Sequence, residues 1–256
     1  MRTLALSLGV LSMACSDHHA APPDIAPGGE LVGCEGAALL ASPSDYAARG
    51  PWPVGARTAT VGGLTTEVWY PATIGSDAGT TPARYDIRAE LSPTEAAKIS
   101  DADNPWQACD CVRELPLDGT HGPYPVILFV HGTASFRHQS LSIVTHWASR
   151  GFVVIAADHP GLKLGDLLAQ ACGGTASPQD LGGNLDALIA AVGQPAGDLA
   201  FLAGHVDAKR LAVAGHSAGA GAAAAASGKP GVRVVISMAG VATTAAGPEL
   251  ESALYL

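Results

Sequence analysis

Uninterrupted runs of apolar residues dominate the second half of the chain. The runs "PVILFV", "FVVIAA", "RLAVAG" and "VRVVISM" lack the alternation of a half-exposed strand. Segments with helical character separate them, at 141–151, from 177 onward and in the Ala-rich stretch 218–226. Parallel strands that are buried on both faces produce this pattern. It therefore predicts an α/β protein with a doubly wound, mostly parallel sheet.

The preceding part of the chain is patterned differently. Residues 58–61 and 65–70 are rich in strand-forming residues and flank a Gly-Gly pair, which predicts a β-hairpin. Residues 72–123 are long and turn-rich. Within them Ser92 and Pro93 have the order of a helix cap and first helical residue.

Three polar segments follow predicted strands directly. They are His131–Thr133, Asp158–Gly161 and His216–Ala218. Working sites in parallel sheets lie at the carboxyl ends of the strands, so we expect these segments to meet at one edge.

A G-x-S-x-G motif spans Gly215–Gly219 with Ser217 at its centre, after a strand and before a small-residue helix. This context is typical of a nucleophile elbow, where a tight turn presents the serine hydroxyl to substrate. The Ala218 amide begins the helix, and the Thr133 amide lies in the loop after an earlier strand. Both are predicted to donate to an oxyanion.

Four longer stretches resemble the α/β-hydrolase superfamily: "GPWPVGARTATVGGLTTEVWYPA", "PYPVILFVHGTASFRHQS", "ASRGFVVIAADHPG" and "VDAKRLAVAGHSAGAG". They are most similar to its branch of dienelactone-hydrolase-like proteins, platelet-activating-factor acetylhydrolases and bacterial cutinases. The resemblance covers about residues 50–240. It implies ester hydrolysis through an acyl-enzyme on Ser217, oxyanion donors at Thr133 and Ala218, and no metal or organic cofactor. Ala220 departs from the second glycine of these relatives.

The acid and histidine of the expected triad are not identified. On this fold they follow the nucleophile in the chain, yet no Asp or His follows Ser217. Three upstream histidines are weak alternatives. His216 should be turned away from the serine, His131 should stabilise its own turn, and His159 should lie in a loop. We expect Asp158 to organise that loop.

One strand and a tail are predicted after Ser217. The resemblance therefore implies a C-terminally truncated hydrolase fold that lacks its expected last strands. Two functions stay open. The chain is a serine ester hydrolase acting on small or lipid-like esters, or a non-catalytic hydrolase-fold protein that at most binds acyl compounds.

The N-terminus predicts export. Residues 1–20 carry one arginine and a short apolar run, as in a signal peptide. Cleavage before a lipidated Cys15, which would tether the chain to a membrane, and ordinary cleavage near Ala20 are both compatible with it. Residues 21–55 are rich in Pro, Gly and Ala and predict an arm, and 56–256 form the incomplete hydrolase domain.

The net charge limits the classes of binding partner, and the cysteine content indicates which disulfides can form. A net charge of -9 argues against nucleic acid as a partner. Cys34, Cys109, Cys111 and Cys172 remain beside Cys15, and an exported chain favours disulfides among them. Three pairings are open, and we expect Cys109 and Cys111 to be too close to pair with each other. Their spacing, without a nearby histidine, does not predict a zinc site.

Overall fold

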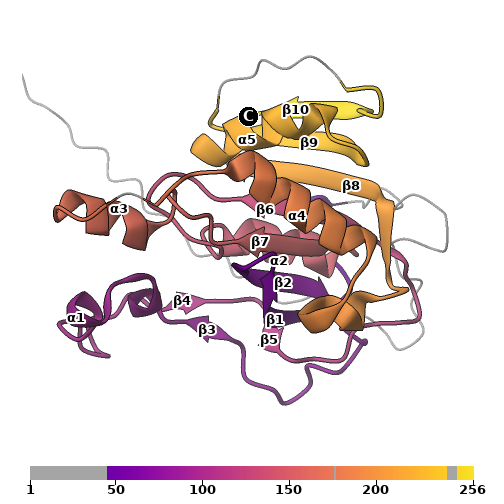
Figure 1. The fold of residues 1–256 in the computed structure, drawn as a ribbon. Coiled ribbons are helices and arrows are strands. Elements are labelled where there is room, and N and C mark those ends of the chain that lie inside the picture. Colours follow the sequence, from indigo (N-terminus) through magenta and orange to yellow (C-terminus); the bar gives the residue numbers. More distant parts are fainter. Residues whose placement is uncertain (1–44, 176, 241–246) are drawn as a thin grey trace, which may run out of the picture.

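The fold is built around one eight-stranded sheet (Figure 1). The computed structural model describes residues 45–175, 177–240 and 247–256. In spatial order the strands are β10 (Ser252–Tyr255), β9 (Val232–Met238), β8 (Val206–His216), β6 (Tyr124–Val130), β7 (Val153–Ala157), β2 (Leu64–Pro71), β1 (Val54–Val61) and β5 (Val112–Arg113). Strands β10 to β7 run parallel, and β2 is antiparallel to both β7 and β1. The predicted α/β architecture with a mostly parallel sheet is confirmed.

Helices cover both faces of the sheet. Helix α2 (Leu141–Ser149) packs on one face, and α4 (Leu181–Gly193) and α5 (Ala218–Ala225) pack on the other. Strand β6 is buried on both sides, with Leu128 in the core under α4 and Phe129 in the core under α2. The remaining helices are α1 (Pro93–Ala96), α3 (Leu164–Ala171) and the 3-10 turns η1 (Ile87–Glu90), η2 (Gly197–Leu202) and η3 (Ala226–Gly228). In the described part of the chain, none of the helices is long and apolar enough to cross a membrane.

The predicted hairpin and helix cap are both present. Strands β1 and β2 pair up to Val61 and Leu64, and the two glycines between them have positive φ angles of 57° and 81°. Such angles suit the tight turn that a right-twisted hairpin needs. Ser92 Oγ accepts a hydrogen bond from the Glu95 amide at 3.4 Å, and Pro93 opens the single turn of α1.

Helix α4 begins later than the sequence predicts. Its N-cap is Asp180, whose carboxylate accepts from the Gly183 amide at 2.8 Å, and not Ser177. Ser177 lies in non-helical chain packed against Gly161: its carbonyl oxygen would be 2.6 Å from a Cβ placed on that glycine. Ser and Asp are both good N-cap residues, so cap preference alone does not select Asp180 over Ser177. The packing of the segment before the helix accounts for the later start.

Two strands follow the elbow, where the sequence predicted one. Residues 252–255, read as a tail, form β10 in parallel register with β9. All four of its residues are exposed, and Leu254 retains 48% of its accessible surface. Strand β10 lies at the edge of the sheet and is short, so it carries no apolar run of the kind that marked the buried strands.

Cys109 and Cys111 form a disulfide with each other, so the expectation that they are too close was wrong. The bend at Asp110 brings their Cα atoms to 5.1 Å, inside the usual range for disulfides. Two backbone bonds to Ala83 hold this bend, one from the Cys109 amide and one to the Cys111 carbonyl. Cys172 is free and exposed.

Several predicted features fall on the N-terminal segment. The signal peptide, the lipidation site at Cys15, Cys34 and the first part of the arm lie outside the described residues. In the part that is described, Trp52 is fully buried and β1 begins at Val54.

Glycine is required where α5 meets β6. A Cβ on Gly219 would overlap the carbonyl oxygen of Val130 and lie 2.6 Å from that of His131, whereas a Cβ on Gly221 would meet nothing within 4 Å. Gly219→Ala should lower the free energy of unfolding by about 1–3 kcal/mol. The control Gly221→Ala, on the same helix, should raise it by about 0.5–1 kcal/mol because alanine favours helix. Urea unfolding of both variants measures this, and equal effects would contradict the close approach.

Candidate active site

The site lies where the chain order of the sheet reverses. From β6 the chain crosses through α2 to β7 on one side, and it later returns to β8 on the other side of β6. A crevice forms at such a switch point, at the carboxyl ends of the strands. Val130 and Gly215 are paired in the β6–β8 register. The segments that follow them, 131–133 and 216–218, therefore emerge side by side.

Ser217 has the backbone conformation of a strained turn. Its φ and ψ are 56° and -116°, in a region that non-glycine residues rarely adopt. Its amide donates to the Met238 carbonyl at 2.9 Å, and it directly precedes α5. Gly215 permits this turn, since a Cβ there would overlap the carbonyl of Gly219. The result is an exposed serine, aimed away from the sheet at the start of a helix.

Gly132 brings the loop after β6 into contact with this turn. A Cβ on Gly132 would lie 3.3 Å from Ser217 Cβ and 3.1 Å from His216 Nδ1. The amides of the next residue, Thr133, and of Ala218 have no acceptor among the described residues. Two free backbone donors thus belong to the two segments that meet at Ser217. An oxygen that gains negative charge beside the serine could accept from both.

The histidines of the described chain are engaged elsewhere. None forms a hydrogen bond with the Ser217 hydroxyl. His131 is fully buried, its Nδ1 contacts the Gly132 carbonyl at 2.8 Å, and its Nε2 accepts from the His159 amide at 3.2 Å. His216 Nδ1 is bonded to the side chain of Gln139 at 2.9 Å. The contact with the Gly132 carbonyl agrees with the role expected for His131 in its own turn. That His216 is turned away from the serine stays a prediction.

His159 is buried completely, not placed in a solvated loop as the sequence suggested. Its Nδ1 is 3.2 Å from the side-chain nitrogen Nδ2 of Asn184, and its Nε2 is buried without a partner among the described residues. Burial, and to a smaller degree the neighbouring His131, lower the pKa of His159 to about 3. Burial also lowers the pKa of His131. Both rings are neutral in the folded protein near pH 7.

A buried ion network fixes the loop between β6 and α2. Arg137 Nη1 lies 2.5 Å from Asp158 Oδ2 and 3.2 Å from Glu90 Oε1, and its Nε lies 3.7 Å from Glu67 Oε2. The Arg137 amide also donates to Asp158 Oδ1 at 2.7 Å. Asp158 therefore organises the loop between β6 and α2, whereas the sequence predicted that it organises the loop after β7.

His138 joins the same network. Its Nε2 lies 3.1 Å from Glu90 Oε1, and its Nδ1 lies 2.6 Å from Gln107 Oε1. Burial alone would raise the pKa of Glu90. The hydrogen bond from His138 and the charge of Arg137 outweigh burial and hold this pKa below its usual value. The loop is thus anchored to η1, to β4 (Gln107–Ala108), to β2 and to the end of β7.

The sequence did not reveal Gln139 as a site residue. Its Oε1 accepts from the Gly132 amide at 2.7 Å, and its Nε2 reaches His216 Nδ1. This carboxamide connects the loop after β6 to the residue before the serine. A lone glutamine after a loop carries no motif, so only the three-dimensional structure identifies it.

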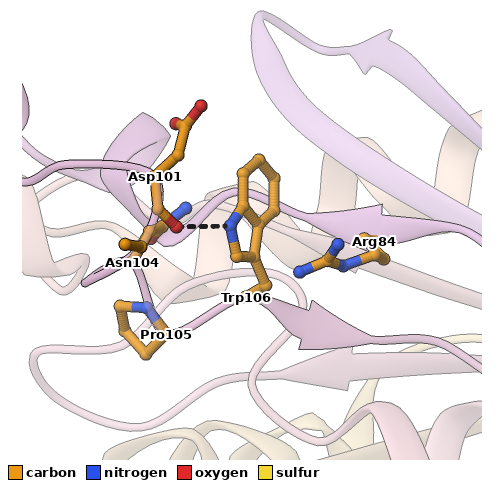
Figure 2. A pocket seen from close by; sticks show the side chains of 6 residues that line it. Arg84, Asp101, Asn104, Pro105 and Trp106 are labelled. Atoms are coloured by element: carbon orange, nitrogen blue, oxygen red, sulfur yellow. Dashed lines mark hydrogen bonds between the residues drawn. The ribbon is translucent and has the colours of Figure 1, made fainter.

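A pocket lies away from Ser217, on a second arm that is distinct from the predicted arm 21–55. This second arm is formed by β3 (Arg84–Tyr85), η1, α1 and β4 (Gln107–Ala108). Figure 1 shows this arm extending from the body on the same side as α3. Figure 2 shows an open pocket of about 690 Å³ around Trp106, whose indole nitrogen donates to the Asp101 carbonyl at 3.3 Å. No residue of the serine turn or of segment 131–133 lines it, so this pocket is separate from Ser217.

Within the ranges that the structure describes, no three histidine, cysteine or carboxylate side chains are grouped so that they could hold a metal ion. The charged groups near the site are instead paired with one another, as in the Arg137 network.

Because His159 is buried and neutral, the free energy of unfolding decreases as the pH is lowered. An exposed histidine in the unfolded chain takes up a proton below about pH 6.5, whereas folded His159 stays neutral to about pH 3. Protons thus favour the unfolded state, and at pH 5 this group alone should remove about 2 kcal/mol of stability relative to pH 7. His159→Gln should show a smaller loss of stability between these pH values in urea unfolding. An identical loss in the variant and the wild type would contradict a neutral His159.

Sequence comparison finds a partial family match. The sequence model of the family described as "Platelet-activating factor acetylhydrolase, isoform II" matches residues 105–161. This segment contains β6, the 131–133 segment and β7, but not Ser217. No curated protein matches the chain.

Two solved structures match the chain, and the first of them is similar to it in fold. A ferulic acid esterase from Streptomyces cinnamoneus is 21% identical with a TM-score of 0.50, over 80% of this chain and 63% of the esterase. A 2,6-dihydroxy-pseudo-oxynicotine hydrolase is 15% identical with a TM-score of 0.38, over 72% of this chain and 36% of that hydrolase. The chain thus spans less than two thirds of either protein. The mostly parallel sheet and the fold shared with the ferulic acid esterase show that the chain has an α/β-hydrolase fold. The family match is partial and extends across the loop beside the Ser217 turn.

Proposed function

We propose that the chain is a serine carboxylic-ester hydrolase that forms an acyl-enzyme on Ser217. The observation that carries this proposal is the φ of 56° and ψ of -116° at an exposed serine between β8 and α5. A strained conformation is kept only where surrounding packing enforces it, and such residues cluster at functional sites. The partial match to an acetylhydrolase family and the fold shared with an esterase support the same reaction class.

The reaction would begin with attack of Ser217 Oγ on the ester carbonyl carbon. The carbonyl oxygen takes up the electron pair of its double bond, and the amides of Thr133 and Ala218 donate to it. When the double bond re-forms, the carbon–oxygen bond to the alcohol breaks, and the alcohol leaves with the proton that the serine hydroxyl has lost. Water then attacks the acyl carbon, the bond from that carbon to Ser217 Oγ breaks, and one proton of the water returns to Ser217 Oγ as the acid is released. The charge on the oxygen develops at the amino end of α5, where helix amides favour negative charge.

Activation of the serine is the open part of this chemistry. A hydroxyl is a weak nucleophile until a base removes its proton. Among the described residues none contacts the Ser217 hydroxyl as a base, and His131 and His216 have other partners at the nitrogens that face the loop. This favours a second candidate function, a hydrolase-fold protein that binds acyl compounds without turning them over. An oxyanion site alone retains about 10³–10⁴-fold acceleration over water in serine hydrolases, so slow acylation is expected even without a base.

The proposed substrates are small or lipid-like carboxylic esters. The net charge of -9 favours uncharged or cationic substrates over polyanions. We also propose export, on the evidence of the apolar segment near residue 1, with a lipid on Cys15 as one form of the mature chain.

The test is acylation of Ser217. Incubation with p-nitrophenyl acetate or butyrate should add one acyl group to the intact chain, detected by mass spectrometry and mapped to the peptide that holds Ser217. Ser217→Ala should abolish the adduct, whereas the control Ser252→Ala, at an exposed serine on β10, should leave it unchanged. Acylation without turnover would favour the acyl-binding protein. No adduct on the wild-type chain would contradict the proposed hydrolase.

A further inference from the structure

We propose that Gln139 is a positioning residue for acyl transfer at Ser217. Its carboxamide ties the Gly132 amide to the His216 ring, and it thereby aims the Thr133 N–H at the oxygen that gains negative charge. The inference rests on the proposed ester chemistry and adds to it a residue that holds one oxyanion donor in place.

The hydrogen-bond partners of Gln139 fix its orientation. A backbone amide can only donate, so the side-chain atom 2.7 Å from the Gly132 nitrogen is the oxygen Oε1. The NH₂ group therefore faces His216 Nδ1 at 2.9 Å, and it needs an acceptor there. His216 must carry its proton on Nε2. The carboxamide thus links the Gly132 loop to His216, which is 77 residues from Gln139 in the chain.

These contacts decide where the Thr133 amide points. The Gly132 amide is held by Gln139, and the Gly132 carbonyl is held by His131 Nδ1 at 2.8 Å. In a trans peptide the carbonyl and the following N–H point in opposite directions. Holding the Gly132 carbonyl toward His131 therefore turns the Thr133 N–H away from it. The amide of Gly132 is occupied, whereas the Thr133 amide has no acceptor among the described residues.

The site needs such a tie because residue 132 is a glycine in a tightly packed place. A side chain there would crowd both Ser217 Cβ and His216, as the Cβ distances of 3.3 and 3.1 Å show. Glycine gives the backbone more freedom than any other residue. Bonds at both its amide and its carbonyl limit that freedom. Gln139 can hold the amide because its neighbours Arg137 and His138 are themselves anchored in the ion network.

The first experiment compares Gln139→Met, which keeps the length of the side chain but not its hydrogen bonds, with Gln139→Glu, which can still accept from the Gly132 amide. Gln170→Met, on an exposed glutamine of α3, is the matched control. The rate of Ser217 acylation by p-nitrophenyl butyrate is measured over a range of ester concentrations. Gln139→Met should lower the maximal rate about 10-fold with little change in the half-saturating concentration, because removal of a whole oxyanion donor costs about 10²–10³. Gln139→Glu should recover most of the rate.

A second measurement reports directly on the hydrogen bond between the Gly132 amide and the Gln139 side chain. Hydrogen exchange of the Gly132 amide should be slow in the wild type and in Gln139→Glu, and at least about 10-fold faster in Gln139→Met, because the amide then has no acceptor. Wild-type acylation rates in Gln139→Met, or unchanged exchange of the Gly132 amide, would overturn the role of Gln139 and leave the ester chemistry of Ser217 standing. A wild-type chain that is not acylated at all would overturn both.

Discussion

The close approach of the β8–α5 turn to the end of β6 is the constraint on which the site depends. Two backbone segments meet there, with no room for a side chain at Gly215 or Gly219 and little room at Gly132. Because adjacent parallel strands end at one edge of the sheet, the loop after β6 and the turn at Ser217 lie side by side there. Ser217 keeps a positive φ in this turn.

The loop that provides one of these amides is held by charge. Arg137 meets three acidic side chains that are themselves almost entirely buried, Glu67, Glu90 and Asp158. Removing such groups from water is unfavourable, and a network of this kind is stable only when its members remain paired. Tyr85 and Arg113 bond to Glu67 and complete the pairing. The loop has little conformational freedom as a result. Gln139 is held in place because the neighbouring Arg137 and His138 are part of this network.

Patterns with a strong local cause were predictable from the sequence. The buried strands, the hairpin at its two glycines, the Ser92 cap and the turn at Ser217 each follow from residues within a few positions of one another. The disulfide between Cys109 and Cys111 was not, because it depends on a bend held by Ala83, which is distant in the chain. The start of α4 at Asp180 and the edge strand β10 likewise depend on tertiary packing.

The least predictable part of the site is its polar support. Gln139, Arg137 and Glu90 come from no motif, and their partners lie tens of residues away. What the sequence predicted well was the turn at Ser217. What it could not predict was how Gln139 ties the loop after β6 to His216, beside that turn.

The most direct measurement is a crystal structure of the chain after reaction with an alkyl phosphonate p-nitrophenyl ester. The account predicts a bond from phosphorus to Ser217 Oγ, with the phosphonyl oxygen about 2.7–3.1 Å from the amide nitrogens of Thr133 and Ala218. A phosphonyl oxygen that points to solvent, or an adduct on a residue other than Ser217, would contradict it.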